Sequence, residues 1–142
     1  MNNTNRIRHR SIQREAHPFC FICSHSNPSG LALDFKVNED GSVTASLLAH
    51  PALEGFPGWL HGGVIASLLD GAMTNCLFAR GLVAVTGELT TRYRRPVEIG
   101  CETTIRAWLE DSCSTLHLMR AELSQRGRLS ASASAKFMEW QA

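Results

Sequence analysis

The chain has 142 residues, of which 44% are hydrophobic and 19% charged, enough for one globular domain with an apolar core. Fourteen basic and thirteen acidic residues leave a formal net charge of +1, which argues against general binding to nucleic acid or to an anionic membrane surface. The longest apolar stretch is interrupted by Asp70 and by glycines, so we do not expect a membrane span.

Residues 1–14 are polar and rich in arginine, and they lack the apolar segment of a secretory signal. The five cysteines are an odd number and one lies within an apolar stretch, which favours reduced thiols and a cytoplasmic location. We therefore expect a single domain at residues 20–142, preceded by a peripheral or partly disordered tail at residues 1–19.

A turn-rich segment at residues 17–30, here called the cysteine segment, contains a Cys20-x-x-Cys23 pair. His17 and His25 flank the pair, and both residue types are zinc ligands. Structural zinc sites usually take a second pair of ligands from another part of the chain, and no second Cys-x-x-Cys is present. The sequence therefore favours packed thiols over a metal site.

Residues 31–48 alternate between apolar and polar side chains, the pattern of strands with one buried face. A first strand is expected at residues 31–37 and a second at residues 43–47, joined by a hairpin turn at residues 38–41. A loop with two prolines follows at residues 50–58.

The one long stretch with helical periodicity extends to about Arg80, and Gly81 is well placed to end it. Its apolar side chains recur at helical spacing: Val64, Ile65, Leu68, Leu69, Ala72, Met73 and Cys76. A single acid, Asp70, interrupts this apolar helix. It lies eight residues after the first of two glycines, and it is the feature that a function must explain.

Four further strands are expected after the helix, at residues 83–95, 101–110, 115–124 and 129–138. Turns are expected at Asp111-Ser112 and at Gln125-Arg-Gly127, and these short connections imply an antiparallel sheet. The repeated alanines of the last strand indicate close packing on a helix.

A helix of about 18 residues, roughly 27 Å long, is too short to cover an open six-stranded sheet. A curved antiparallel sheet of five or six strands wrapped around the helix, the α+β hotdog fold, resolves this difficulty. An ordinary two-layer α+β sandwich has the same order of elements.

These segments resemble the hotdog-fold acyl-CoA thioesterases, in particular their PaaI-type branch. The mark of that branch is His-Gly-Gly at the start of the central helix and an acid nine residues after the histidine, here His61-Gly62-Gly63 and Asp70. The strand that ends in Tyr93-Arg-Arg-Pro96 is similar to the family segment that carries a Ser or Thr, and Thr86 falls at that position. The likeness extends over about residues 20–138.

One position departs from the family pattern. Several relatives place a polar side chain about six residues before the histidine, whereas this chain has Gly55 near that position, with Glu54 beside it.

The resemblance implies hydrolysis of an acyl-CoA thioester to a carboxylic acid and free CoA, without a cofactor. The N–H of Gly62 is then the main donor to the developing oxyanion, with Gly63 in support, while His61 fixes the loop or contacts the thioester. Asp70 acts either as a general base on water or as a nucleophile, and Thr86 orients the water. A structural partner, such as an arginine or a capping group, is the competing interpretation of Asp70.

Gly62 and Asp70 are eight residues apart on one helix, about 12 Å, so they cannot both touch one thioester within a subunit. A second copy with its helix alongside in the opposite sense would bring the two together, which predicts a homodimer or a dimer of dimers.

The phosphates of CoA attract arginines, and the candidates are Arg92, Arg94, Arg95, Arg126 and Arg128. Solvated surface charge is the competing interpretation of each. A second hypothesis for the chain is a non-catalytic hotdog module that binds acyl-CoA or a related ligand; the retained Asp70 favours the enzyme.

Overall fold

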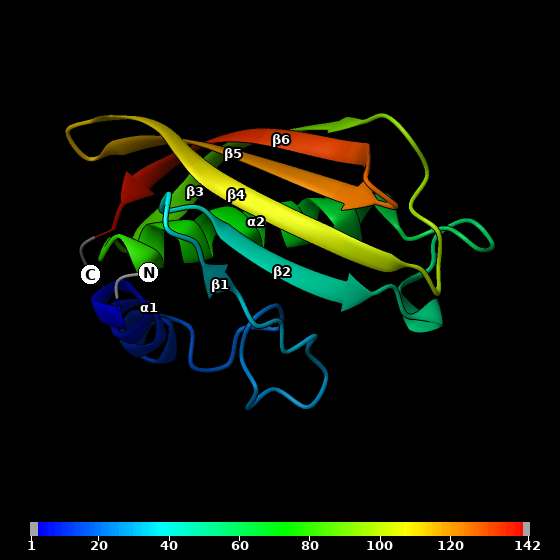
Figure 1. Cartoon of the computed structure of the whole chain (residues 1–142), viewed down its shortest axis with the longest axis horizontal. Coiled ribbons are helices and arrows are strands. Elements are labelled where there is room, and N and C mark those ends of the chain that lie inside the picture. The colour runs from blue at the N-terminus through cyan, green and yellow to red at the C-terminus, as the bar shows by residue number, and fades with distance from the viewer. Residues whose placement is uncertain (1–2, 141–142) are drawn as a thin grey trace.

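The computed structural model describes residues 3–140, in which a six-stranded antiparallel sheet curves around a long helix (Figure 1). The elements in chain order are α1 (Asn3–Ala16), β1 (Lys36–Val37), β2 (Val43–Leu48), a short 3-10 helix η1 (Pro51–Leu53), α2 (Gly62–Ala79), β3 (Ala84–Tyr93), β4 (Glu102–Cys113), β5 (Leu116–Gln125) and β6 (Arg128–Glu139). The strand order is β1-β2-β4-β5-β6-β3, with every neighbouring pair antiparallel. This is the hotdog arrangement that the sequence predicted.

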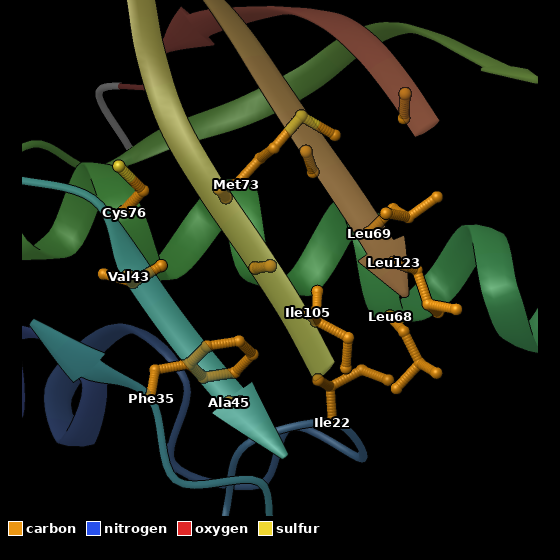
Figure 2. Close-up of a cluster of buried hydrophobic side chains, with 14 of the residues drawn as sticks. Ile22, Phe35, Val43, Ala45, Leu68, Leu69, Met73, Cys76, Ile105 and Leu123 are labelled. Atoms are coloured by element: carbon orange, nitrogen blue, oxygen red, sulfur yellow. The ribbon is translucent and has the colours of Figure 1, made fainter. Parts of the chain in front are cut away.

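The core lies between α2 and the concave face of the sheet. Leu68, Leu69 and Met73 of α2 face buried side chains of β2, β4 and β5, among them Val43, Ile105 and Leu123 (Figure 2). Full burial of each large apolar side chain contributes about 1.5–3 kcal/mol relative to exposure. The strand β6 contacts α2 along a row of buried alanines, Ala131, Ala133 and Ala135, which confirms the predicted close packing.

By length and composition alone α2 could cross a membrane, contrary to our expectation from its interruptions. Its 18 residues have a mean hydropathy of 1.3, but 67% of them are buried inside this fold. An enclosed core helix has this composition because apolar neighbours surround most of it.

Within the stretch expected as a peripheral or partly disordered tail, residues 3–16 form the helix α1, which lies outside the sheet beside α2 (Figure 1). The contacts that hold it are polar: the buried His9 hydrogen-bonds through Nε2 to Oδ1 of Asn75 at 2.9 Å, and Nη2 of Arg8 donates to the carbonyl of Ala79 at 3.1 Å. Hydrophobic periodicity gives no signal for a helix attached in this way.

The strand expected at residues 31–37 is shorter than predicted, since only Lys36–Val37 pairs with β2. The N–H groups of Leu31 and Leu33 donate instead to carbonyls of the cysteine segment, at 2.7 and 2.8 Å. Ala32, with φ of 47°, breaks the extended conformation, although the predicted alternation of burial persists.

The turn expected at Asp111-Ser112 is also wrong, because β4 continues to Cys113. A register shift between Leu109 and Asp111 inserts a bulge that the strand accommodates, and the chain turns at Ser114, where φ is 55°. The remaining predicted turns are confirmed.

Candidate active site

The first candidate group is the N-terminus of α2. His61 caps the helix, and its Nδ1 accepts the N–H of Gly63 at 2.8 Å. The Gly63 N–H, expected as a supporting donor, is therefore already engaged. The N–H of Gly62 has no acceptor among residues 3–140, and it points to the positive end of the helix dipole. Gly62 is thus a donor available to a ligand.

Tyr93 at the end of β3 packs on this helix terminus. Its hydroxyl donates to the carbonyl of Gly62 at 2.8 Å, and its ring carbons lie 3.6–3.7 Å from where a Cβ on Gly62 would be. Tyr93 is not among the site residues predicted from the sequence. Its position directly before the two arginines and the proline that end the strand was the signal that could have identified it.

A cavity of about 370 Å³ opens beside Gly62. Its lining residues are Gly55, Phe56, Leu60, His61 and Gly62. A space of this size with few polar groups suits a small apolar ligand. Glu54 is the acid beside Gly55, the position that departs from the family pattern. It does not line the cavity, and its Oε2 accepts the N–H of Gly58 at 3.0 Å within the loop.

The second candidate group is Asp70, together with Thr86 of β3. The hydroxyl of Thr86 donates to Oδ1 of Asp70 at 2.5 Å. The pairing of β3 with β6 shifts register between Thr86 and Glu88, and such a bulge re-aims the neighbouring side chain. No lysine or arginine among residues 3–140 forms an ion pair with Asp70. A structural ion pair therefore does not explain this acid.

Both groups lie on one side of α2, here called the open face. Its members are half-buried or exposed: Gly62, Gly63, Val64, Ala66, Ser67 and Asp70. The helix is continuous from Gly62 past Asp70, so their separation of about 12 Å along one chain holds. Beside this face runs β3, the edge strand of the sheet, on which Val85 is 44% and Tyr93 52% exposed.

The structure gathers the predicted arginines at the end of the sheet where Tyr93 meets α2. Arg92, Arg94 and Arg95 are exposed there, and the N–H groups of the last two donate to the carbonyl of Ser130, at 2.8 and 3.0 Å. Two more belong to the adjoining hairpin. Arg128 is exposed, whereas Nη1 of Arg126 forms an ion pair with Glu98 at 2.7 Å.

One group among residues 3–140 has the composition and proximity to hold a metal ion: His17, Cys20 and Cys23. It belongs to the cysteine segment and not to the cavity beside Gly62. His25, the fourth candidate from sequence, hydrogen-bonds to Asp34 at 2.8 Å instead. Burial lowers the pKa of His17 below its ordinary value of 6.5 and raises the pKa of the Cys23 thiol to about 11.

The comparison with protein families decides the membership of this chain. The family model described as the thioesterase superfamily matches residues 57–132, just over half of the chain and the part that holds both candidate groups. The chain belongs to the thioesterase superfamily.

Among relatives of this thioesterase-superfamily chain is the acyl-coenzyme A thioesterase THEM4 of Bos taurus. The two are 32% identical over 76 residues, which are 54% of this chain and 31% of that protein. The chain thus aligns with about a third of the length of this relative.

Solved structures share the fold. The PaaI protein of E. coli has a TM-score of 0.73 at 20% identity, covering 79% of this chain and 82% of that one. Smu.793 of Streptococcus mutans UA159, a structure bound to acetyl CoA, has a TM-score of 0.71 at 19% identity, covering 76% of this chain and 88% of that one.

Proposed function

We propose that the chain hydrolyses an acyl-CoA thioester to a carboxylic acid and free CoA. One observation carries this proposal. A helix N–H that has no acceptor within the described part of the chain lies beside a small cavity, and it shares the open face of α2 with a carboxylate that accepts a hydrogen bond from a hydroxyl. The THEM4 relative, named an acyl-coenzyme A thioesterase, supports the same chemistry.

The N–H of Gly62 acts as the oxyanion donor in this mechanism. The thioester carbonyl accepts the N–H, and the negative charge that develops on its oxygen lies at the positive end of α2. Two contacts hold the peptide between Gly62 and Gly63, next to the donor. His61 accepts its N–H, and Tyr93 donates to its carbonyl. Both contacts keep the donor in place before the substrate arrives.

Asp70 supplies the attack on the carbonyl carbon. As a general base, its carboxylate takes a proton from water while the water oxygen forms the new C–O bond. The C–S bond then breaks, and the proton held by Asp70 passes to the thiolate to give free CoA. As a nucleophile, its oxygen attacks the carbonyl carbon and the C–S bond breaks to release CoA, which leaves an acyl anhydride that water hydrolyses in a second step. In both routes the bond from Thr86 orients the carboxylate; the water that we expected Thr86 to orient can be held by the free Asp70 oxygen.

A second copy of the chain completes the site. The distance of about 12 Å between Gly62 and Asp70 requires a partner whose α2 runs in the opposite sense, so that each site combines Gly62 of one copy with Asp70 of the other. The ten-residue edge strand β3, with Val85 and Tyr93 exposed, supports pairing at this side of the sheet. The assembly is a homodimer or a dimer of dimers.

The CoA moiety is bound by the arginines at the end of β3 and at the β5–β6 hairpin. Arg92, Arg94, Arg95 and Arg128 are exposed at the end of the sheet where Tyr93 meets α2, and phosphates would accept their hydrogen bonds. Arg126 is the weakest candidate because it already forms an ion pair with Glu98 of the same chain. The structural relative bound to acetyl CoA supports this choice of ligand.

The test is hydrolysis of short, long and aromatic acyl-CoAs by the wild type and by Asp70→Asn. We expect the wild type to release free thiol from at least one of them, and the variant to be slower by about a hundredfold or more. Full turnover by Asp70→Asn would refute its role. Binding of acyl-CoA without hydrolysis by the wild type would instead indicate a non-catalytic binding module.

A further inference from the structure

We propose that His17, Cys20 and Cys23 bind one zinc ion, at a site that the thioesterase chemistry does not use. The sequence favoured packed thiols because it offers no second Cys-x-x-Cys pair. The structure brings His17, three residues before the pair, close to both cysteines, through turns at residues 18–19 and 21–23 that the spacing alone does not reveal.

The donor atoms lie close together, and the distance between one pair of them matches tetrahedral zinc. One donor atom from each of the three residues lies within 4.8 Å of the other two. Zinc bonds of about 2.3 Å to sulfur and about 2.05 Å to nitrogen, at a tetrahedral angle, place those two atoms about 3.6 Å apart. Sγ of Cys23 and Nδ1 of His17 are 3.6 Å apart without any metal, so this pair of donors needs little rearrangement.

The surrounding residues hold the ligands in this arrangement. The ring of His17 packs edge-on against Phe78 of α2, with centroids 4.9 Å apart. The backbone N–H of His17 donates to the carbonyl of Gln13 at 2.8 Å. The side chain of Gln13 donates in turn to the carbonyl of Cys23 at 2.8 Å. Positioned ligands of this kind lower the ordering cost of metal binding.

Water completes the coordination. The described residues offer no fourth His, Cys, Asp or Glu in this group, and His25 is engaged by Asp34. A cavity of about 480 Å³ reaches His17 and Cys23 and has ample room for one water molecule. Three protein ligands and one water are a known zinc coordination.

The ion would fix the cysteine segment against α2. Ile22 lies between the two cysteines in sequence and is buried, and its Cγ2 lies 2.7 Å from where a Cβ on Gly71 would be. Gly71 is the neighbour of Asp70, so the turn that holds the metal also packs on the helix that carries the proposed active site. This effect on packing stands whether or not the chain hydrolyses thioesters.

The test uses the full chain, freed of metal with a chelator and kept reduced, and titrated with Co²⁺ and then Zn²⁺. We expect one metal per chain, the intense visible bands of tetrahedral Co²⁺, near-ultraviolet charge transfer from thiolate to cobalt, and displacement of the cobalt by zinc. Zinc should also raise the melting temperature. The charge-transfer band reports thiolate ligation in the wild type itself, so this result does not depend on the folding of any variant.

Variants then assign the ligands. Cys20→Ser, Cys23→Ser and His17→Gln should each weaken metal binding by more than about tenfold. The exposed Cys113 and the nearby His25 serve as matched controls, and Cys113→Ser and His25→Gln should bind as the wild type does. No stoichiometric metal in the reduced wild type, a Cys20–Cys23 disulfide that persists under reductant, or unchanged binding by the ligand variants would overturn the proposal.

Discussion

Replacing Gly62 by proline should remove the proposed oxyanion donor and leave α2 in place. Proline removes the N–H and adds a pyrrolidine ring, and it is favoured at the first position of a helix. The residue before a proline must be extended, and His61 already has φ of −61° and ψ of 135°. We therefore expect a folded variant whose stability is equal to or slightly above that of the wild type, by up to about 1 kcal/mol.

We expect the substitution to lower kcat. Removal of one oxyanion donor costs about 2.7–4 kcal/mol in other enzymes, a loss in kcat of about 10²–10³. Gly62→Ala is the matched control, because it keeps the N–H and its Cβ would meet the Tyr93 ring at 3.6–3.7 Å, an ordinary contact. Steady-state hydrolysis of the best acyl-CoA, with circular dichroism as a check on folding, measures the difference. A Gly62→Pro enzyme with wild-type kcat would refute the assignment of this donor.

Three further predictions test other contacts. Thr86→Val removes the hydrogen bond to Asp70 and should lower kcat about tenfold, which corresponds to the weakest hydrogen bonds made to charged groups. Thr86→Ser keeps the hydroxyl and should retain most activity. Equal rates for both variants would contradict this role. Gly71→Ala gains about 1 kcal/mol of helix propensity but forces Cγ2 of Ile22 aside at a cost of about 1–3 kcal/mol. Urea unfolding should therefore show a free energy of unfolding lower by roughly 1 kcal/mol. Ile22→Leu lacks this methyl group and should relieve the loss. A stabilised Gly71→Ala in the wild-type background would be the opposite result. Burial lowers the pKa of His9 below 6.5, so the unfolded chain binds more protons just below that pH and the free energy of unfolding falls as pH decreases. His9→Gln should flatten this fall between about pH 7 and about pH 5.5, and an unchanged slope would show that His9 does not cause it.

Much of the sheet could be predicted because side-chain alternation and strand pairing agree there. Residues 43–47 alternate and pair with β4, and the alternating end of the chain pairs with β5. Residues 31–35 alternate equally well, yet their backbone bonds go to the cysteine segment. Periodicity indicates which side chains are buried, but it does not indicate which part of the chain accepts the backbone hydrogen bonds of a segment.

The polar contacts of the fold were harder to predict. The helix α1 is held by His9 and Arg8 through partners on α2 that lie 66 and 71 residues away in the chain, and no local pattern indicates such contacts. The same limit applies to the site. The positions of Gly62, Asp70 and Thr86 followed from the resemblance, whereas the engagement of the Gly63 N–H by His61 required the geometry of the cap.

The central claim is that each site joins Gly62 of one copy to Asp70 of another. The most direct measurement is the activity of a mixed assembly, in which Gly62→Pro and Asp70→Asn chains carry different affinity tags and are expressed together. A mixed dimer contains one site with both wild-type groups and one with neither, so random pairing of the two variants should restore about a quarter of wild-type turnover. If both groups served one thioester within a single chain, the mixture would be no more active than the two variants measured separately, and that result would contradict the shared site.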